Sequence, residues 1–205
     1  MLRKERNKEW ILYCGLALAV LLLAQCKSPF ATREPEEPKT EQSSWIQPTS
    51  PNYVMANLRN AVAEKNITNY LRCFADTSNS PKQFRFIAEP TVANANPGLF
   101  ENWRIESEQT FINQLMLFLP RDSTSQLSFS PKSENTYQDS VVLVQEYHLI
   151  IHHTCKSEEC PRDMVGQAEF RLIRTPEDLW FIYLWIDRSV GDKPTWSLLK
   201  AYFGK

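Results

Sequence analysis

The feature that most constrains how this chain folds is a change of hydrophobic periodicity near residue 120. Before that point apolar residues recur at i, i+3, i+4 and i+7, the spacing of amphipathic helices, whereas after it apolar and polar residues alternate over long runs. Short turns between consecutive strands predict an antiparallel meander. The expected strands are Leu127–Ser130, Tyr137–His153, Met164–Arg174 and Leu179–Asp187, and turn-forming residues separate them at 131–133, 157–159 and 175–178.

The helical part of the sequence begins with a recognisable start signal. Ser50 is suited to be an N-cap, and Pro51 follows it at the first helical position. Proline is tolerated there because the N–H that it lacks would have no partner within the helix. A second, shorter helical stripe covers Ile67–Phe74. We therefore expect two consecutive helices at the start of the folded domain.

A short strand and a long helix are expected between these two helices and the meander. The strand is predicted at Phe84–Ala88, and a loop is predicted between Pro90 and Pro97. The pattern at Phe100–Leu119 is apolar over more than half of the helix circumference, so we expect this helix to be buried on most sides.

The last predicted strand is apolar on both faces, so both faces are expected to be covered. Strict alternation places its residues in two sets, Phe181, Tyr183 and Trp185 on one face and Trp180, Ile182, Leu184 and Ile186 on the other.

Charge and composition exclude some functions. The 205 residues carry 23 basic and 24 acidic side chains, a net charge of −1, which offers no general attraction to a nucleic-acid backbone. Five glycines disfavour a glycine-rich phosphate loop, and no pattern indicates a cofactor. The sequence predicts a chain that binds no nucleic acid and needs no cofactor.

The first 25 residues have the pattern of a secretory signal. Four basic residues before position 9 precede an uncharged run, Ile11–Ala24, which spans only about 21 Å as a helix against a hydrocarbon core of about 30 Å. The run ends in Leu22-Leu23-Ala24-Gln25-Cys26, which resembles a bacterial lipobox, although Gln25 departs from the usual small residue. That resemblance implies lipidation of Cys26; an uncleaved anchor and ordinary secretion remain the alternatives.

The expected organisation follows from this leader. Residues 1–25 are predicted to be a signal peptide, residues 26–49 a lipid anchor and disordered tether rich in proline and charge, and residues 50–205 the folded domain. The resemblance implies a protein of the bacterial cell envelope, attached to a membrane through its lipid. Because Lys27 stands where a retention signal would have aspartate, an outer-membrane location is expected, facing the periplasm or the surface.

The order of the predicted elements, helix, helix, strand, long helix and antiparallel strands, resembles the NTF2-like (SnoaL-like, cystatin-like) α+β fold. In that fold a curved antiparallel sheet wraps around a long central helix and N-terminal helices to form a cone. The stretches that carry the resemblance are Val54–Phe74, Trp103–Leu119 and Leu179–Asp187, and the tail Thr195–Phe203 is similar to that of uncharacterised bacterial lipoproteins of this type.

The resemblance implies several functions, because members of this superfamily include isomerases, dehydratases, cyclases and binding modules. We expect a membrane-anchored envelope lipoprotein that acts as a ligand-binding or protein-interaction module. The alternative is a small enzyme of the same fold that uses an acid or base in the cone, and a purely structural envelope component is a third possibility.

The weak candidates for such an acid or base are Glu146 and His148, two residues apart on one strand face. If that face lined the cone, Glu146 could orient His148 as a general base. The favoured interpretation is that both face outward, with Tyr147 and Leu149 on the core face.

Cys155 and Cys160 flank the predicted turn between the two longest strands. In an oxidising envelope compartment two cysteines across a hairpin predict a disulfide. A zinc site that adds His153 is the less favoured alternative, because no fourth ligand is evident. Cys73 is expected to be a small buried hydrophobe, and Cys14 belongs to the signal.

Aromatic residues of the last strands raise two further possibilities. A set that could line a pocket for an apolar ligand, with core packing as its alternative, is Tyr147, Phe181, Tyr183 and Trp185. The opposite sheet face suggests a homodimer formed sheet to sheet through Val142, Val144, Ile150, Ile182 and Leu184.

Overall fold

The computed structural model describes residues 43–205. The predicted signal peptide at 1–25, the predicted lipidation site Cys26 and most of the predicted tether lie outside these residues. Between residues 43 and 205 no helix is both long enough and apolar enough to cross a membrane.

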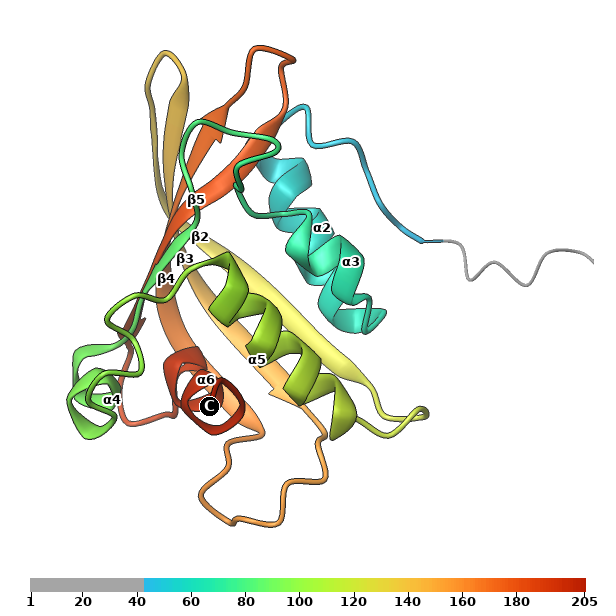
Figure 1. Ribbon diagram of the computed structural model, residues 1–205, viewed down its shortest axis with the longest axis vertical. Helices are drawn as coiled ribbons and strands as arrows, with labels where there is room; N and C mark the ends of the chain where they lie inside the picture. The colour runs from blue at the N-terminus through green and yellow to red at the C-terminus, as the bar shows by residue number, and fades with distance from the viewer. Residues whose placement is uncertain (1–42) are drawn as a thin grey trace, which may run out of the picture. The chain divides into compact units, whose positions relative to one another are not determined.

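A curved five-stranded sheet forms one layer of the domain, and helices cover one of its faces (Figure 1). The strand order is β1-β5-β4-β3-β2; β1 runs parallel to β5, and all other neighbours are antiparallel. This arrangement confirms the predicted α+β class with a meander of long strands. The strands are β1 (Arg85–Ile87), β2 (Ser125–Thr136), β3 (Ser140–Ile151), β4 (Asp163–Arg174) and β5 (Trp180–Ser189).

The two N-terminal helices form where their start signals lie. Helix α2 (Pro51–Ala63) is capped by the side chain of Ser50, which accepts a backbone N–H of the first turn. Helix α3 (Ile67–Leu71) is shorter than the apolar stripe suggested, and Asn66 caps it in the same way. Short polar caps therefore define both starts.

The loop predicted between Pro90 and Pro97 is wrong, because this segment contains helix α4 (Pro90–Ala95). Pro90 occupies the first helical turn, and the Glu89 side chain accepts the Val92 N–H at 2.9 Å. Pro90, predicted from the sequence to begin a loop, is instead the first residue of a helix, and Glu89 directly before it is the N-cap.

The long helix is shorter and less buried than predicted. Helix α5 (Ile105–Leu117) buries a single stripe, and Leu117 near its end is 78% exposed. Trp103 is buried, but it lies in the segment before the helix. The apolar residues on the other side of α5 are thus solvent-facing, and one face of this helix contacts the core.

Residues 131–133 form no turn, which corrects the predicted end of the first long strand. Strand β2 continues to Thr136, and its register against β3 shifts between Pro131 and Ser133, as at a β-bulge. Because β2 pairs only with β3, its outer edge needs no N–H donor. Proline is tolerated at such edges and bulges.

A second irregularity overturns the strict alternation predicted for the last strand. The register of β5 against β4 slips at Tyr183, because Ile182 and Leu184 pair with consecutive residues of β4. Ile182 and Trp185 therefore both face the helices and are fully buried, whereas Tyr183 is only partly buried. One inserted residue therefore reverses, from that point on, which residues of the strand face the core and which face outward.

The described domain begins before α2. Residues 43–49, assigned to the tether from their composition, contact the domain: the Ile46 N–H donates to Asn57 Oδ1 at 2.8 Å, and Asn57 Nδ2 donates to the Ile46 carbonyl at 2.6 Å. The Trp180 N–H donates to the Pro48 carbonyl at 2.8 Å. These hydrogen bonds to backbone groups offset the entropic cost of ordering residues 43–49, which the composition had predicted to remain disordered.

The chain ends in helix α6 (Trp196–Phe203), which packs between α5 and the sheet. Its buried residues include Trp196, Leu199 and Phe203, together with Lys200. The tail that contributed to the sequence resemblance is therefore an integral part of the core.

Candidate functional site

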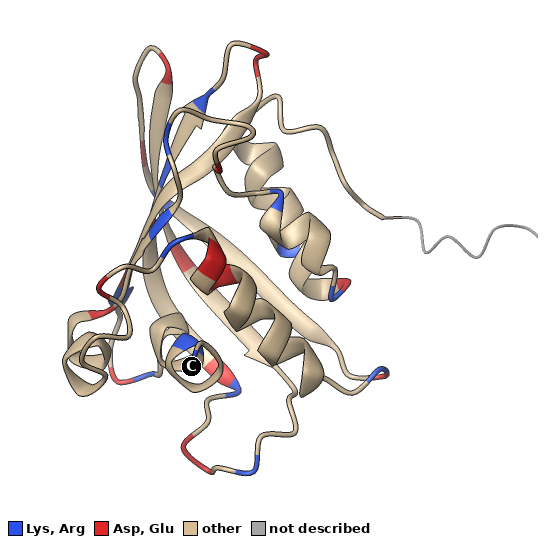
Figure 2. Cartoon of the chain, in the orientation of Figure 1, with Lys and Arg blue, Asp and Glu red and all other residues tan. Residues whose placement is uncertain are grey.

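A buried ion pair joins α5 to α6. Figure 2 shows acidic positions in the first part of α5 and a basic position on α6. Glu108 stands on the buried stripe of α5 and Lys200 on α6, and both side chains are 0% exposed. Lys200 Nζ donates to both carboxylate oxygens. Tyr70 OH donates to Oε1 at 2.5 Å and Trp103 Nε1 to Oε2 at 2.6 Å. The carboxylate is thus bound by donors from three different parts of the chain.

Aromatic rings enclose the Lys200 ammonium. Its Nζ lies 4.2 Å from the ring centroid of Phe86, 4.4 Å from Trp185, 4.9 Å from Phe111 and 5.3 Å from Trp103, all within cation–π range. Burial lowers the pKa of Lys200 to about 8, although Glu108 opposes the shift. The rings and the carboxylate replace the hydration shell of the ammonium.

Asp187 is the centre of a second buried polar network. Its Oδ1 accepts from Tyr147 OH at 2.8 Å, and its Oδ2 accepts from the N–H of Ser197 at 2.7 Å and from the hydroxyl at 2.5 Å. Tyr147 OH in turn accepts the Trp196 N–H at 2.7 Å. Burial raises the pKa of the Asp187 carboxyl, and the bonds from Ser197 and Tyr147 oppose that shift. The network fastens the start of α6 to the end of β5.

Gly166 on β4 makes this network possible. A Cβ at Gly166 would collide with the hydroxyl oxygen of Tyr147 and lie 2.8 Å from the Arg188 carbonyl. The Tyr147 hydroxyl therefore reaches Asp187 only because the neighbouring strand has no side chain at this point.

Beneath α5, in the part of the chain from residue 43 onward, there is little free space. The cavity beneath α5 measures about 10 Å³ and is lined by apolar side chains such as Phe111, Leu115 and Ile151. Small-molecule sites usually measure about 300–1,000 Å³. Side chains thus fill the place where an enclosed ligand would sit.

Several open hollows lie on the surface of the described domain instead, and two of them are relevant here. One of about 830 Å³ lies between the segment before α2, α3 and the start of α5, and its lining includes Trp45, Arg72 and Phe181. The other, of about 500 Å³, lies between β1 and the segment from α4 to α5, and its lining includes Arg85, Phe100 and Arg104.

No protein-family model and no curated protein matches this sequence. Solved structures do match its fold. A conserved protein from Planctomyces limnophilus covers 68% of this chain and 92% of its own, at 12% identity and a TM-score of 0.52. A protein of the NTF2-like family from Streptomyces avermitilis matches over the same shares at 9% identity and a TM-score of 0.48. A protein with a cystatin-like fold from Nostoc punctiforme covers 69% of this chain and 89% of its own, at 11% identity and a TM-score of 0.44.

The order β1-β5-β4-β3-β2 in a curved, mostly antiparallel sheet with helices on one face, together with the match to the Planctomyces limnophilus protein, decides the fold. The domain has an NTF2-like fold. At such low identities the likeness extends to the fold alone, so activity has to be argued from the residues of this chain.

Glu146 and His148 lie on the outer face of the NTF2-like sheet, away from the helices. Glu146 pairs with Lys132 at 2.8 Å, and His148 Nε2 lies 2.7 Å from an oxygen of Asp163, which also binds Lys193. The structure shows no bond between Glu146 and His148, so the orienting contact that general-base chemistry would use is not formed.

The four aromatic residues proposed as a pocket lining are separated in the NTF2-like domain. Tyr147 and Trp185 are core residues with 1% and 0% exposure. Phe181 lines the hollow beside α3, whereas Tyr183 is half-buried outside the core and the Lys82 ammonium lies 4.1 Å from its ring centroid. These residues do not share one cavity.

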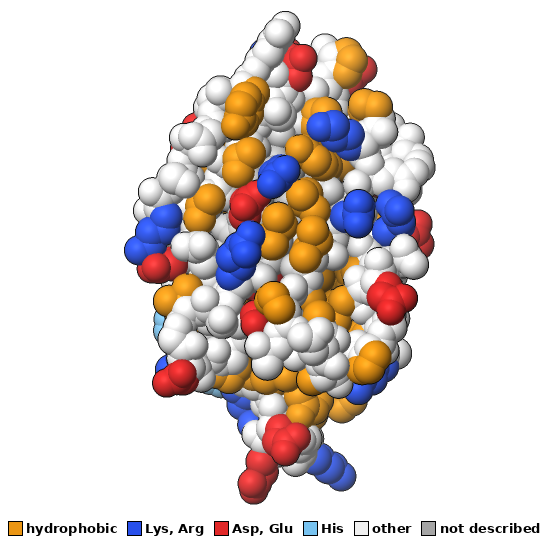
Figure 3. Space-filling view, turned by 90° about the vertical axis from the view of Figure 1, so that its left-hand side faces the viewer, with side chains coloured by type: hydrophobic (Ala, Val, Ile, Leu, Met, Phe, Trp, Pro, Cys, Tyr) orange, Lys and Arg blue, Asp and Glu red, His pale blue; other side chains and the backbone are white. Residues whose placement is uncertain are grey.

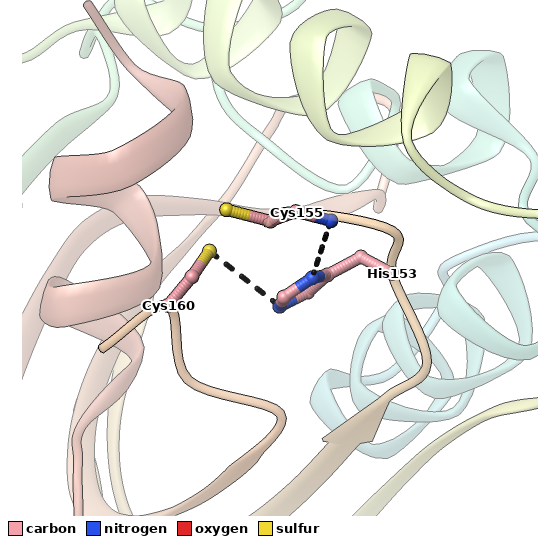
Figure 4. A group of neighbouring side chains, drawn as sticks. All are labelled: His153, Cys155 and Cys160. Atoms are coloured by element: carbon pink, nitrogen blue, oxygen red, sulfur yellow. Dashed lines mark hydrogen bonds between the residues drawn. The ribbon is translucent and has the colours of Figure 1, made fainter. Parts of the chain in front are cut away.

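Cys155 and Cys160 are free thiols in the NTF2-like domain, and His153 lies beside them (Figure 4). Cys160 is buried, and burial together with Cys155 raises its pKa to about 12. Cys73 is buried just after the end of α3, and its Sγ lies 3.3 Å from the Asn69 carbonyl. Burial raises the pKa of the Cys73 thiol.

The outer face of the NTF2-like sheet carries rows of hydrophobic side chains with basic and acidic side chains between them (Figure 3). Val142, Val144, Ile150 and Leu184, four of the residues named for the predicted dimer face, are half-buried on it. Ile182 is absent from this face, because the bulge at Tyr183 turns it into the core.

Sequence reasoning missed the most strongly held polar residues. Glu108 occupies the same stripe as Phe111, Ile112 and Leu115, at the i, i+3, i+4 and i+7 positions of the buried face. A carboxylate on an apolar stripe is the signal that could have revealed a buried charge. Its partner Lys200 was visible only as part of the tail.

Proposed function

We propose that this protein is a membrane-anchored envelope lipoprotein whose NTF2-like domain is a protein-interaction module that forms a homodimer through its outer sheet face. The observation that carries the proposal is the filled interior, where the Glu108–Lys200 pair and its aromatic enclosure occupy the place of a ligand. An interior closed in this way leaves the surface to provide function.

Opening the interior for a substrate would be unfavourable. A ligand would have to displace the donors of Glu108 and expose an ammonium that four rings now enclose. Leaving a buried charge without partners costs several kcal/mol, of order 3–5 kcal/mol when one partner of a pair is removed. The enzyme alternative lacks support of this kind, since Glu146 and His148 make their ion pairs on the outer face.

The outer sheet face has the character of a self-complementary surface. An ion pair between Glu169 and Arg171, 2.7 Å apart, lies on β4. Apolar residues of the neighbouring strands flank it, Val144 and Ile186 opposite Glu169, and Val142 and Leu184 opposite Arg171. In a two-fold dimer the acid of one copy can face the base of the other, while the apolar flanks pack together.

We expect Leu184→Glu to convert a dimeric chain into a monomer. The added carboxylate would be desolvated within the apolar flank, and because residue 184 pairs with Arg171 it would compete for the guanidinium that the partner copy's acid is to face. The measurement is the molar mass of the full chain in detergent by sedimentation or light scattering. Leu117→Glu, an apolar-to-acidic change at the exposed end of α5, is the matched control and should leave the mass unchanged.

The dimer proposal fails if the wild-type chain is monomeric over the tested concentrations. It also fails if Leu184→Glu keeps the wild-type mass, or if Leu117→Glu dissociates the protein equally. The last result would indicate a general loss of solubility or folding rather than a broken interface.

The anchor part of the proposal has its own test. Mass spectrometry of the protein from a membrane fraction should find a lipid-modified N-terminus at Cys26, and Cys26→Ser should release the chain from the membrane. An unmodified Met1 N-terminus in the mature protein would refute the anchor while leaving the dimer proposal untouched.

A further inference from the structure

Three side chains of types that can bind metal ions lie close together in the loop that joins β3 to β4. One ligand atom each from His153, Cys155 and Cys160 lies within 4.8 Å of the others. Cys160 Sγ is 3.7 Å from His153 Nε2, and both sulfurs lie on the same side of the imidazole ring (Figure 4). His153 and Cys160 are buried and Cys155 is half-buried, so the cluster opens to solvent on the Cys155 side.

Backbone groups fix the orientation of the His153 imidazole at both ring nitrogens. Its Nε2 lies 2.9 Å from the Pro161 carbonyl, an acceptor that requires the proton on Nε2. The lone pair of Nδ1 then remains, and the Cys155 N–H approaches it at 3.3 Å, a long hydrogen bond. Nε2 is also the nitrogen that faces Cys160 Sγ, so a cation bound at Nε2 would replace the bond to Pro161, and the ring proton would move to Nδ1 in place of the long bond from Cys155.

The loop that carries the three donors is fixed at several points. Arg162 donates to the carbonyls of His153 and Cys155 at 3.3 and 3.0 Å, and the Thr154 N–H donates to the Phe118 carbonyl at 2.9 Å. The His153 ring also packs edge-on against Phe203 of α6, 5.4 Å between centroids. Donors held by this many bonds need little ordering when a cation binds.

We propose that His153, Cys155 and Cys160 bind one Zn²⁺ ion, with the fourth tetrahedral position open to water or to a donor from another molecule. Two thiolates and one imidazole form a soft N/S donor set, which selects zinc over calcium or magnesium. With bonds of about 2.0–2.3 Å, any two donors of a tetrahedral zinc lie about 3.5–3.8 Å apart. The 3.7 Å between Cys160 and His153 already meets this spacing, and the rest of the cluster needs only a small contraction.

The competing occupant of the same atoms is a Cys155–Cys160 disulfide. A disulfide uses only the two sulfurs and gives no role to a buried imidazole directed at them, whereas a zinc ion uses all three donors. The sulfurs are not bonded in the structure. The position of His153 therefore favours the metal.

The test uses the full chain, purified in detergent under reducing conditions and freed of metal. Addition of Co²⁺ as a spectroscopic substitute should produce a thiolate-to-metal charge-transfer band and the intense visible bands of tetrahedral coordination, and one equivalent of Zn²⁺ should abolish both. Competition with a chromogenic chelator then measures the zinc affinity.

Cys160→Ser and His153→Gln should each weaken zinc by more than the roughly 10–100-fold loss that follows from outer-shell changes. His152→Gln is the matched control, because His152 is an exposed histidine directly beside the cluster, and it should bind zinc like the wild type. Two ligand variants are measured so that the test still holds if one of them fails to fold. The fold of each variant is checked by circular dichroism without metal.

Three outcomes would overturn the site. One is the absence of thiolate bands in the reduced wild-type chain, and the second is bands of equal strength in the Cys160→Ser and His153→Gln variants. The third is a Cys155–Cys160 disulfide found by peptide mass spectrometry in protein whose thiols were blocked at cell lysis. None of these outcomes bears on the dimer, so the two proposals can fail separately.

Discussion

Replacing Lys200 by methionine is expected to lower the free energy of unfolding by about 3–5 kcal/mol. Methionine is close to lysine in shape and should fit the aromatic enclosure, so the loss comes from the Glu108 carboxylate left buried without its cation. Urea unfolding at neutral pH, followed by tryptophan fluorescence, measures the change.

Adding Glu108→Gln to Lys200→Met should recover part of that loss. Glutamine is neutral, and its carbonyl oxygen can still accept a hydrogen bond from Tyr70 or Trp103. We expect a coupling energy of about 1–3 kcal/mol between the two sites, the usual range for residues in direct contact. Strictly additive losses in the double variant would show that the pair is not formed as described.

The wild type and the Lys200→Met/Glu108→Gln variant should also differ in how their stability depends on pH. Because the pKa of Lys200 is lowered from 10.5 to about 8 in the folded protein, the unfolded chain binds more protons between these two values. Stability therefore rises with pH wherever the unfolded state holds the extra proton. The wild type should gain stability relative to the Lys200→Met/Glu108→Gln variant as the pH increases from about 8 towards 10. A constant difference would contradict the burial of the ammonium.

Trp185→Ala is expected to cost about 3–5 kcal/mol, the range found for removal of a buried aromatic side chain. Trp185 is 0% exposed, and its ring contacts those of Phe74, Phe86, Phe170 and Trp196. Its removal would leave a cavity at the centre of the aromatic core and expose the Lys200 ammonium to it.

Tyr183→Ala, two residues away on the same strand, is the matched comparison. Strict alternation would place both side chains on one face and predict similar losses, whereas the bulge places Tyr183 on the outer face. We expect the Tyr183 variant to lose less than half as much free energy of unfolding as the Trp185 variant. Equal losses in the same urea experiments would contradict the bulge.

Much of the fold follows from local patterns in the sequence. The start of α2 is encoded by Ser50 and Pro51, and the meander is encoded by long alternating runs with turn residues between them. The predictions that were wrong concern single residues whose effect depends on neighbours. Pro131 is compatible with a strand because β2 is an edge, and Pro90 begins a helix because Glu89 caps it.

The candidate sites were less predictable than the fold. The proximity of His153, Cys155 and Cys160 follows from their spacing in one loop, so the sequence suggested it, but the choice between disulfide and metal depended on where the imidazole points. The Glu108–Lys200 pair joins residues 92 positions apart, and no local pattern connects them.

The sequence by itself determined the class of the protein, helices followed by an antiparallel sheet, because hydrophobic period and turn chemistry are local properties. Only the tertiary structure decided that a buried ion pair and aromatic rings occupy the interior beneath α5. Whether a polar side chain lines an empty pocket or closes a buried ion pair depends on which distant element packs against it, and here α6 brings Lys200 to Glu108. For the same reason the slip at Tyr183, which assigns each residue of β5 to the core or to the outer face, is a property of strand pairing and not of the strand alone.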